Sequence, residues 1–317
     1  SWLTAFSVAC VCTLALGQSW PAKPIRLVVP FPAGGGTDII ARDVSNKLSS
    51  AAKWNFIVDN KPGSGGNLGV DAAAKSPADG YTLVIGQTSN LAINPSLYSK
   101  LPYDSIQDLT PIGLIGRAPL VMVVPANSPY KTLTDLVNAA KTTSAELNYA
   151  TSGNGTVAHL AVEMFQREAG IKLTHIPYKG ASQGITDVIG GLVHVYVSSV
   201  PTLIGYIKSG KLRALAVTSL KRTDDLPQVP TVAESGYKNF EAVTWFGLLG
   251  PARLPSTVVQ TANQTLNKAL SSPDLKSKLE DQGLDVAPGT PEQFAQLIRT
   301  DMAKWGQVVK ASGAKAD

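Results

Sequence analysis

The chain contains very little cysteine. Among its 317 residues only Cys10 and Cys12 are cysteines, and both lie in the N-terminal segment 1–17. The rest of the chain therefore has no thiol nucleophile, no disulfide framework and no thiolate metal site. A cysteine-free mature chain suits an exported protein, because an unpaired thiol is a liability in the oxidising cell envelope.

The segment 1–17, SWLTAFSVACVCTLALG, lacks any charged residue. It is shorter than the ~20 apolar residues that a transmembrane helix requires. Ala15 and Gly17 form the small-residue pattern at which a signal peptidase cuts. We expect a signal-peptide remnant that is cleaved on export, and hence a periplasmic protein. The alternatives are a membrane anchor and a lipoprotein anchor at Cys10.

Sequence motifs for catalysis, metal binding and nucleic-acid binding are also scarce. The net charge of +5 comes from scattered basic residues, which excludes a nucleic-acid stripe and weakly favours anionic small ligands. His159, His175 and His194 lack metal-ligand spacing, so we expect no metal. The phosphate loop G-x-x-x-x-G-K-[ST] and the dinucleotide motif G-x-G-x-x-G do not occur. We therefore expect no cofactor and no catalytic residues.

What the sequence does contain is an alternation of strand and helix patterns. Apolar runs predict strands, and apolar residues at helical spacing predict helices. A strand–helix–strand order favours a parallel sheet covered by helices, and hence an α/β fold. Strands are expected at 25–29, 55–60, 81–86, 147–151, 174–177, 193–199 and 212–219, and helices at 37–49, 68–75, 132–141, 157–169, 181–191, 256–270, 273–282 and 291–310.

Two apolar stretches, 114–125 and 245–251, have the character of strands that cross between two lobes. They divide the chain into a first lobe of residues 18–118 and 246–317 and a second lobe of residues 119–245. Two short crossings make a hinge, and the cleft between the lobes is the expected binding site.

Glycine-rich turns follow two of the predicted strands. Glycine lets a ligand approach the backbone, and the first N–H groups of a helix attract anions. Gly34–Thr37 in the first lobe and Ser152–Thr156 in the second are expected to face each other across the cleft. Hydroxyl and amide side chains at other strand ends add donors. The predicted ligand-binding residues are Phe31, Ala33, Gly34, Gly35, Thr88, Ser89, Asn90, Ser152, Gly153, Asn154, Thr156, His159, Ser198 and Ser199.

A series of motifs, in order from about residue 20 to the C-terminus, resembles the Bug-type extracytoplasmic solute receptors of tripartite tricarboxylate transporters. They include PIRLVVPFPAGGGTDIIAR, NKPGSGGNLG, YATSGNGTVAHLAVEMF, HIPYKGASQGITDVIGG, LPQVPTVAESGY and WFGLLGPA. The resemblance implies a two-lobed periplasmic-binding-protein fold of type II-like design, with two crossing strands as its hinge. It also implies a noncatalytic, monomeric receptor that captures a small carboxylate for membrane subunits of a transporter. In that family the loop matching Phe31–Gly36 pins a ligand carboxyl group, and loops matching Thr88–Ser89 and Ser152–Thr156 supply further donors.

One stretch departs from the family pattern. Where many relatives carry a sequence like VDVMFDNLP, this chain has VHVYVSSVP, so that His194 replaces an acid and Ser198-Ser199 replace an Asp-Asn pair. This change disfavours an amino-acid ligand, because a carboxylate is the natural partner of an ammonium group. We expect a dicarboxylate or an aromatic carboxylate. A secreted α/β enzyme acting on a carboxylate, and a sensor for a membrane signalling partner, are the alternatives.

Overall fold

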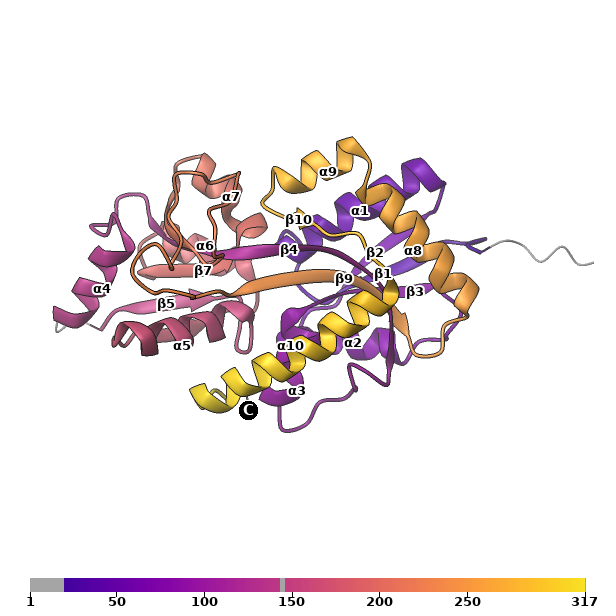
Figure 1. Ribbon diagram of the computed structural model, residues 1–317, viewed down its shortest axis with the longest axis horizontal. Helices are drawn as coiled ribbons and strands as arrows, with labels where there is room; N and C mark the ends of the chain where they lie inside the picture. Colours follow the sequence, from indigo (N-terminus) through magenta and orange to yellow (C-terminus); the bar gives the residue numbers. More distant parts are fainter. Residues whose placement is uncertain (1–19, 143–145, 317) are drawn as a thin grey trace, which may run out of the picture.

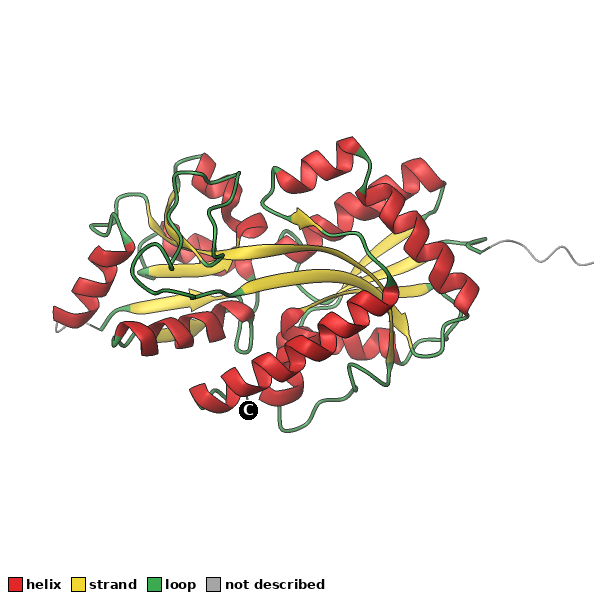
Figure 2. Ribbon diagram, viewed as in Figure 1, coloured by secondary structure: helices red, strands yellow, loops and turns green. Residues whose placement is uncertain are grey.

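The structure is a computed structural model that describes residues 20–142 and 146–316. The predicted signal peptide, with Cys10 and Cys12, lies outside the described residues. The molecule is elongated and has a lobe at each end, with a sheet running through its middle and helices on both sides (Figures 1 and 2).

The first lobe is built on three parallel strands, β1, β2 and β3, whose alignment follows from the strand–helix–strand order of the chain. Strand β1 is buried along most of its length, so its apolar run forms part of the core. The elements of this lobe are β1 (Ile25–Val29), α1 (Gly36–Ala52), β2 (Phe56–Asn60), α2 (Asn67–Ala74), β3 (Thr82–Gln87), α3 (Asn94–Leu97), α8 (Ser256–Leu270), α9 (Pro273–Glu280) and β10 (Asp285–Val286).

The second lobe repeats this plan with β5 parallel to β6 and β7. Its elements are α4 (Leu133–Thr142), β5 (Asn148–Thr151), α5 (Val157–Ala169), β6 (Thr174–Pro177), α6 (Ala181–Ile189), β7 (Val195–Ser199), α7 (Val200–Lys208) and β8 (Leu212–Val217). Helix α7 was not predicted. It begins directly after β7, and Pro201 lies in its first turn, where proline is well tolerated although it suggests a break in the sequence.

Two long strands, β4 (Leu109–Pro125) and β9 (Val243–Pro251), connect the lobes, as Figure 1 shows. They pair antiparallel with each other, because the chain leaves the first lobe along β4 and returns along β9. The described strands form one sheet of order β2-β1-β3-β9-β4-β7-β5-β6, with β8 and β10 paired to β4. The strand–helix–strand units of each lobe are parallel, as expected, and the two crossing strands add antiparallel pairs that make the sheet as a whole mixed.

The last helix, α10 (Pro291–Ser312), contacts both lobes. Its start is held by a capping box between Thr290 and Gln293. The indole N–H of Trp245 on β9 donates to Asp301 at 2.7 Å, and Arg167 on α5 donates to the carbonyl of Ala311 at 2.9 Å. Helix α10 therefore spans the hinge alongside the crossing strands. None of the helices in the described residues is both long and apolar enough to cross a membrane.

Candidate ligand-binding site

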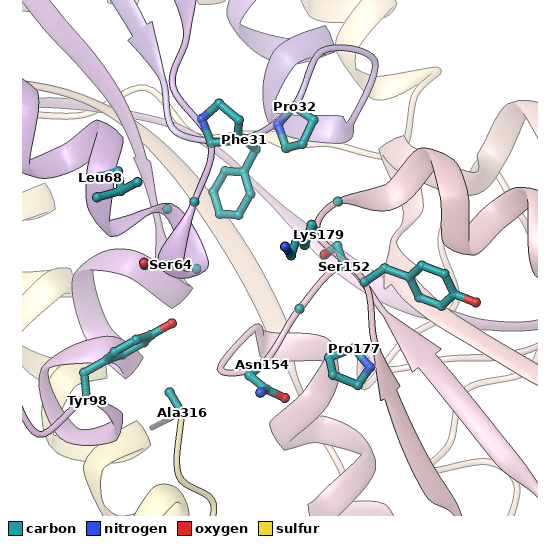
Figure 3. Close-up of a pocket in the computed structure, with 17 residues that line it drawn as sticks. Phe31, Pro32, Ser64, Leu68, Tyr98, Ser152, Asn154, Pro177, Lys179 and Ala316 are labelled. Carbon is teal, nitrogen blue, oxygen red and sulfur yellow. The ribbon is translucent and has the colours of Figure 1, made fainter.

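A cavity of about 600 Å³ lies between the two lobes. Figure 3 shows Phe31, Leu68 and Tyr98 on one side of it and Ser152, Asn154 and Lys179 on the other. Most of its wall comes from loops that follow β1, β2, β5 and β6, each of which leads into a helix. The first lobe contributes Phe31, Pro32, Pro62, Gly63, Ser64, Gly65, Gly66, Leu68 and Tyr98, the second lobe Ser152, Gly153, Asn154, Pro177, Tyr178, Lys179 and Gly180, and the end of the described chain Ala316.

The first-lobe wall is a glycine turn before α2. Gly63, Gly65 and Gly66 all have positive φ, at 133°, 64° and 93°. A β-carbon on Gly66 would lie 3.1 Å from the Phe31 ring and 2.8 Å from the side-chain nitrogen of Asn90. Only glycine allows this turn, with Gly66 as the N-cap residue of α2, to lie so close to both side chains.

Asn90 lies fully buried beneath Gly66. Its carboxamide oxygen accepts a hydrogen bond from the N–H of Gln87 at 3.0 Å, which fixes the orientation of the side chain. Its NH₂ group has no hydrogen-bond partner among the described residues. A buried donor without a partner is costly, so this group marks a place where a further acceptor would be stabilising.

The second-lobe wall is the turn between β5 and α5. Gly153 and Gly155 have positive φ, and Thr156 caps α5 by accepting a hydrogen bond from the N–H of His159 at 3.3 Å. The N–H of Gly155 donates to Nδ1 of His159 at 3.2 Å. The Thr151 hydroxyl lies 2.8 Å from Nε2 of His175. Side chains from β5, β6 and α5 thus hold this turn from behind.

His159, His175 and Tyr149 form a stack behind the turn. The ring centroids of His159 and His175 are 4.1 Å apart, and those of His175 and Tyr149 are 4.7 Å apart. Burial lowers the pKa of His175 to about 3, and repulsion from His159 adds to the shift. Burial also lowers the pKa of His159, against the opposing effect of Glu163. Both imidazoles are neutral at neutral pH. His159 supports the turn from behind, as a packing or capping histidine does, and its contact with a ligand stays a prediction.

The loop after β1 is organised by Asp38, which is buried at the start of α1. Its carboxylate accepts hydrogen bonds from the N–H of Gly34, from Arg42 and from Asn60, each at 2.9 Å. Burial raises the pKa of Asp38, but the bonds from Arg42, Gly34 and Asn60 outweigh it and hold the pKa below its usual value. This loop carries Phe31, which lines the cavity.

Contacts between the lobes differ from those the sequence suggested. The N–H of Gly36 donates to the hydroxyl of Thr202 on α7 at 3.1 Å, so the turn Gly34–Thr37 meets α7. The turn Ser152–Thr156 instead meets Gly65, whose β-carbon would lie 3.6 Å from the Asn154 carbonyl. A β-carbon on Gly180 would come within 2.6 Å of Pro32. The lobes therefore touch on both sides of the cavity.

The predicted binding residues fall into two groups. Phe31, Ser152, Gly153 and Asn154 line the cavity. The remaining ones lie outside its lining: Ala33, Gly34 and Gly35 continue the Phe31 loop, Ser198 and Ser199 end β7 beside α7, Thr156 and His159 lie behind the second-lobe turn, and Thr88, Ser89 and Asn90 are buried below the first-lobe wall. Contact of any of these residues with a ligand stays a prediction.

Sequence reasoning missed two segments of the wall, 62–66 and 177–180. Both carry the signal that was applied elsewhere, namely glycine between a predicted strand and a predicted helix, in NKPGSGGNLG and HIPYKGASQG. Within the described ranges, no group of three or more histidine, cysteine, aspartate or glutamate side chains is placed to hold a metal ion.

Comparison with known proteins gives consistent matches. The family model described as "Tripartite tricarboxylate transporter family receptor" matches residues 40–314. A Pseudomonas sp. protein, the "UPF0065 protein in tcbD-tcbE intergenic region", is 39% identical over 92% of this chain and 87% of its own length. Protein BugT of Bordetella pertussis is 37% identical over 94% of this chain and 92% of its own length.

Solved structures agree with these sequence matches. An R. palustris protein with adipate has a TM-score of 0.90 at 34% identity, over 93% of this chain and 98% of that one. MatC of Rhodopseudomonas palustris with bound malate has a TM-score of 0.86 at 27% identity, over 92% of this chain and all of that one. The periplasmic binding protein BugD has a TM-score of 0.88 at 31% identity, over 93% of this chain and 99% of that one.

Proposed function

Because the chain belongs to the tripartite tricarboxylate transporter receptor family, a family of solute-binding receptors rather than enzymes, we propose that it captures a small organic carboxylate in the cavity between its lobes. It then delivers the acid to membrane subunits of a transporter. The observation that carries this proposal is the wall itself: glycine turns at the starts of helices meet there from both lobes.

The wall has the chemistry that an anion requires. The N-cap residues of α2 and α6, Gly66 and Gly180, both line the cavity, so the positive ends of two helices are directed at it. Among the described lining residues there is no carboxylate side chain. Micromolar affinity corresponds to about 8 kcal/mol. Charge-assisted hydrogen bonds contribute about 1.5–3 kcal/mol each, so three of them with apolar burial account for such affinity.

The cavity also accommodates a carbon skeleton. Phe31, Leu68 and Tyr98 supply apolar and aromatic surface, and the volume of about 600 Å³ lies in the usual range for small-molecule sites. The adipate and malate in two related structures support an aliphatic dicarboxylate. An aromatic carboxylate is the second ligand class that this wall suits.

We also propose where the receptor works. An N-terminal signal peptide exports it, cleavage releases it into the periplasm, and it acts as a monomer between solute and membrane partner. The apolar segment 1–17 and the periplasmic setting of BugD support this assignment. N-terminal sequencing of protein recovered from the periplasmic fraction tests it, with a mature end near Gly17 expected.

A thermal-shift screen tests ligand capture. The panel contains adipate, malate, succinate, phthalate and benzoate, with adipamide as an uncharged control. A ligand that binds only the folded state raises the melting temperature by mass action. We expect at least one acid, and not adipamide, to raise it, and chromatography to recover the acid unchanged. Chemical conversion of the acid, or no shift with any acid, contradicts the proposal.

A further inference from the structure

We propose that Lys179 forms an ion pair with a second carboxylate of the ligand, so that the receptor prefers dianionic acids to monoanionic acids of the same carbon skeleton. The inference rests on the proposed function and names the residue that sets its substrate class. It makes Lys179 a specificity-determining residue.

Lys179 is the only charged side chain among the described residues that line the cavity. It lies in the loop between β6 and α6, and Figure 3 shows its amino group directed into the space between Phe31 and Ser152. A lysine ammonium in such a place attracts any anion that enters the cavity.

The acidic groups nearby do not neutralise this charge. No ion pair in the described part of the chain includes Lys179 within 4.0 Å. The nearest acid along α6, Asp187, accepts a hydrogen bond from the hydroxyl of Tyr178 at 2.6 Å. The ammonium group is therefore available to a ligand.

Lys179 is exposed and lies at the positive end of a helix. It directly precedes Gly180, the N-cap residue of α6, and the first turn of α6 contains no acidic residue. A cation near a helix N-terminus is repelled by the helix dipole, which favours anions there. A carboxylate bound here would interact favourably with the ammonium group and with the N-terminus of α6 at the same time.

The opposite wall offers a second, uncharged donor site. There the turn Gly63–Gly66 lines the cavity and leads into α2, whose first N–H groups favour an anion. A ligand with one carboxylate toward this turn and another toward Lys179 would span the cavity past Phe31. Its carbon chain would lie against the aromatic ring.

Matched acid pairs separate this inference from the proposed function. Calorimetric titration compares adipate with hexanoate, succinate with butyrate, and phthalate with 2-methylbenzoate, because in each pair a methyl group replaces one carboxylate. The proteins are the wild type, Lys179→Met and the control Lys172→Met. Lys172 is an exposed lysine just before β6, so this control removes the same charge at the opposite end of the strand.

For the dicarboxylate that binds best, we expect Lys179→Met to lower the affinity roughly tenfold and to lower that of its monocarboxylate partner less than twofold. Lys172→Met should change neither. The dicarboxylate preference of the wild type should shrink at high salt, since the ion pair is screened. Equal losses for both acids of a pair, or no loss, would overturn the role of Lys179 while leaving carboxylate capture standing. If the wild type binds none of the six acids and gives no thermal shift with malate, both proposals fail.

Discussion

The N–H of Gly36 at the start of α1 donates a hydrogen bond to the hydroxyl of Thr202 on α7, with 3.1 Å between nitrogen and oxygen. This bond is buried and joins the two lobes directly. The Ser199 hydroxyl lies 3.0 Å from the same oxygen, so the end of β7 supports the contact. A ligand can favour the arrangement in which the lobes touch only through contacts that it makes with both lobes at once.

Removal of this inter-lobe bond should weaken ligand binding. Thr202→Val keeps the shape of the side chain and leaves the buried N–H of Gly36 without its acceptor, at a cost of about 1–3 kcal/mol to the arrangement in which the lobes touch. We expect the apparent dissociation constant for the best acid to rise roughly fivefold or more, measured by calorimetry. Thr265→Val, on an exposed part of α8, is the control. Unchanged affinity in Thr202→Val would show that this contact does not contribute to the binding-competent state.

A side chain at Gly180 should hinder the approach of the lobes. Gly180 has φ of 138°, and a β-carbon there would meet Pro32 of the other lobe at 2.6 Å. We expect Gly180→Ala to weaken acid binding at least tenfold and to enlarge the molecule in small-angle scattering. Gly191→Ala, beyond the other end of α6, also has positive φ, with open space around the new methyl group. If Gly180→Ala and Gly191→Ala bind the acid with equal affinity, the close approach of Gly180 to Pro32 is not needed for binding.

The predicted role of the Phe31–Gly36 loop has its own test. Gly34 has φ of 81° and open space where a β-carbon would stand, so Gly34→Val would project a side chain outward without a clash. If this loop pins a ligand carboxyl group, the variant should lose the thermal shift produced by the acid. Gly210→Val carries the same strain, with φ of 71° and open space, and Gly210 is not part of the cavity wall. A Gly34→Val protein that binds like Gly210→Val would remove this loop from the site.

Acid should destabilise the protein in part through the buried histidine pair. The pKa of His175 is lowered to about 3 and that of His159 is also lowered, whereas the unfolded chain takes up these protons below pH ~6.5. The stability that these groups contribute is complete above pH ~6.5 and is lost as the pH falls toward 3. We expect the melting temperature to fall over this window, and to fall less steeply in His175→Phe, which keeps an aromatic ring in the stack.

Carboxylates contribute to the same trend and serve as the internal reference. A hydrogen bond from Lys47 lowers the pKa of Asp274 to about 2, and this group is retained in His175→Phe. The difference between the two melting curves therefore isolates the histidine contribution. If the melting temperatures of the wild type and His175→Phe fall in parallel between pH 7 and pH 4, the histidine pair does not contribute to the acid destabilisation.

Much of the architecture was predictable because local patterns agree with the tertiary fold. The apolar run at 25–29 and the helical spacing at 256–270 match β1 and α8 residue for residue. Helix α7 was missed, since Pro201 so soon after a strand resembles a chain break. The antiparallel pairing of the two crossing strands was not predicted, because strand direction there depends on where the chain returns, which no local pattern encodes.

The type of turn that lines the cavity could be predicted from the sequence, but which turns face each other could not. Glycine between strand and helix indicated the turn Ser152–Thr156, and three residues of this turn line the cavity, although its contact with a ligand stays a prediction. The same signal at 63–66 faces it, whereas the turn Gly34–Thr37 meets α7 instead. Which loops oppose each other is set by how the lobes are rotated about β4 and β9, and that depends on packing of the whole hinge.

A crystal structure with the acid that gives the largest thermal shift tests the central claim most directly. We predict electron density for that acid between the lobes, in contact with Phe31, the Gly63–Gly66 turn and Asn154, and with a carboxylate within hydrogen-bond distance of Lys179. Density for the acid only outside this cavity would contradict the account.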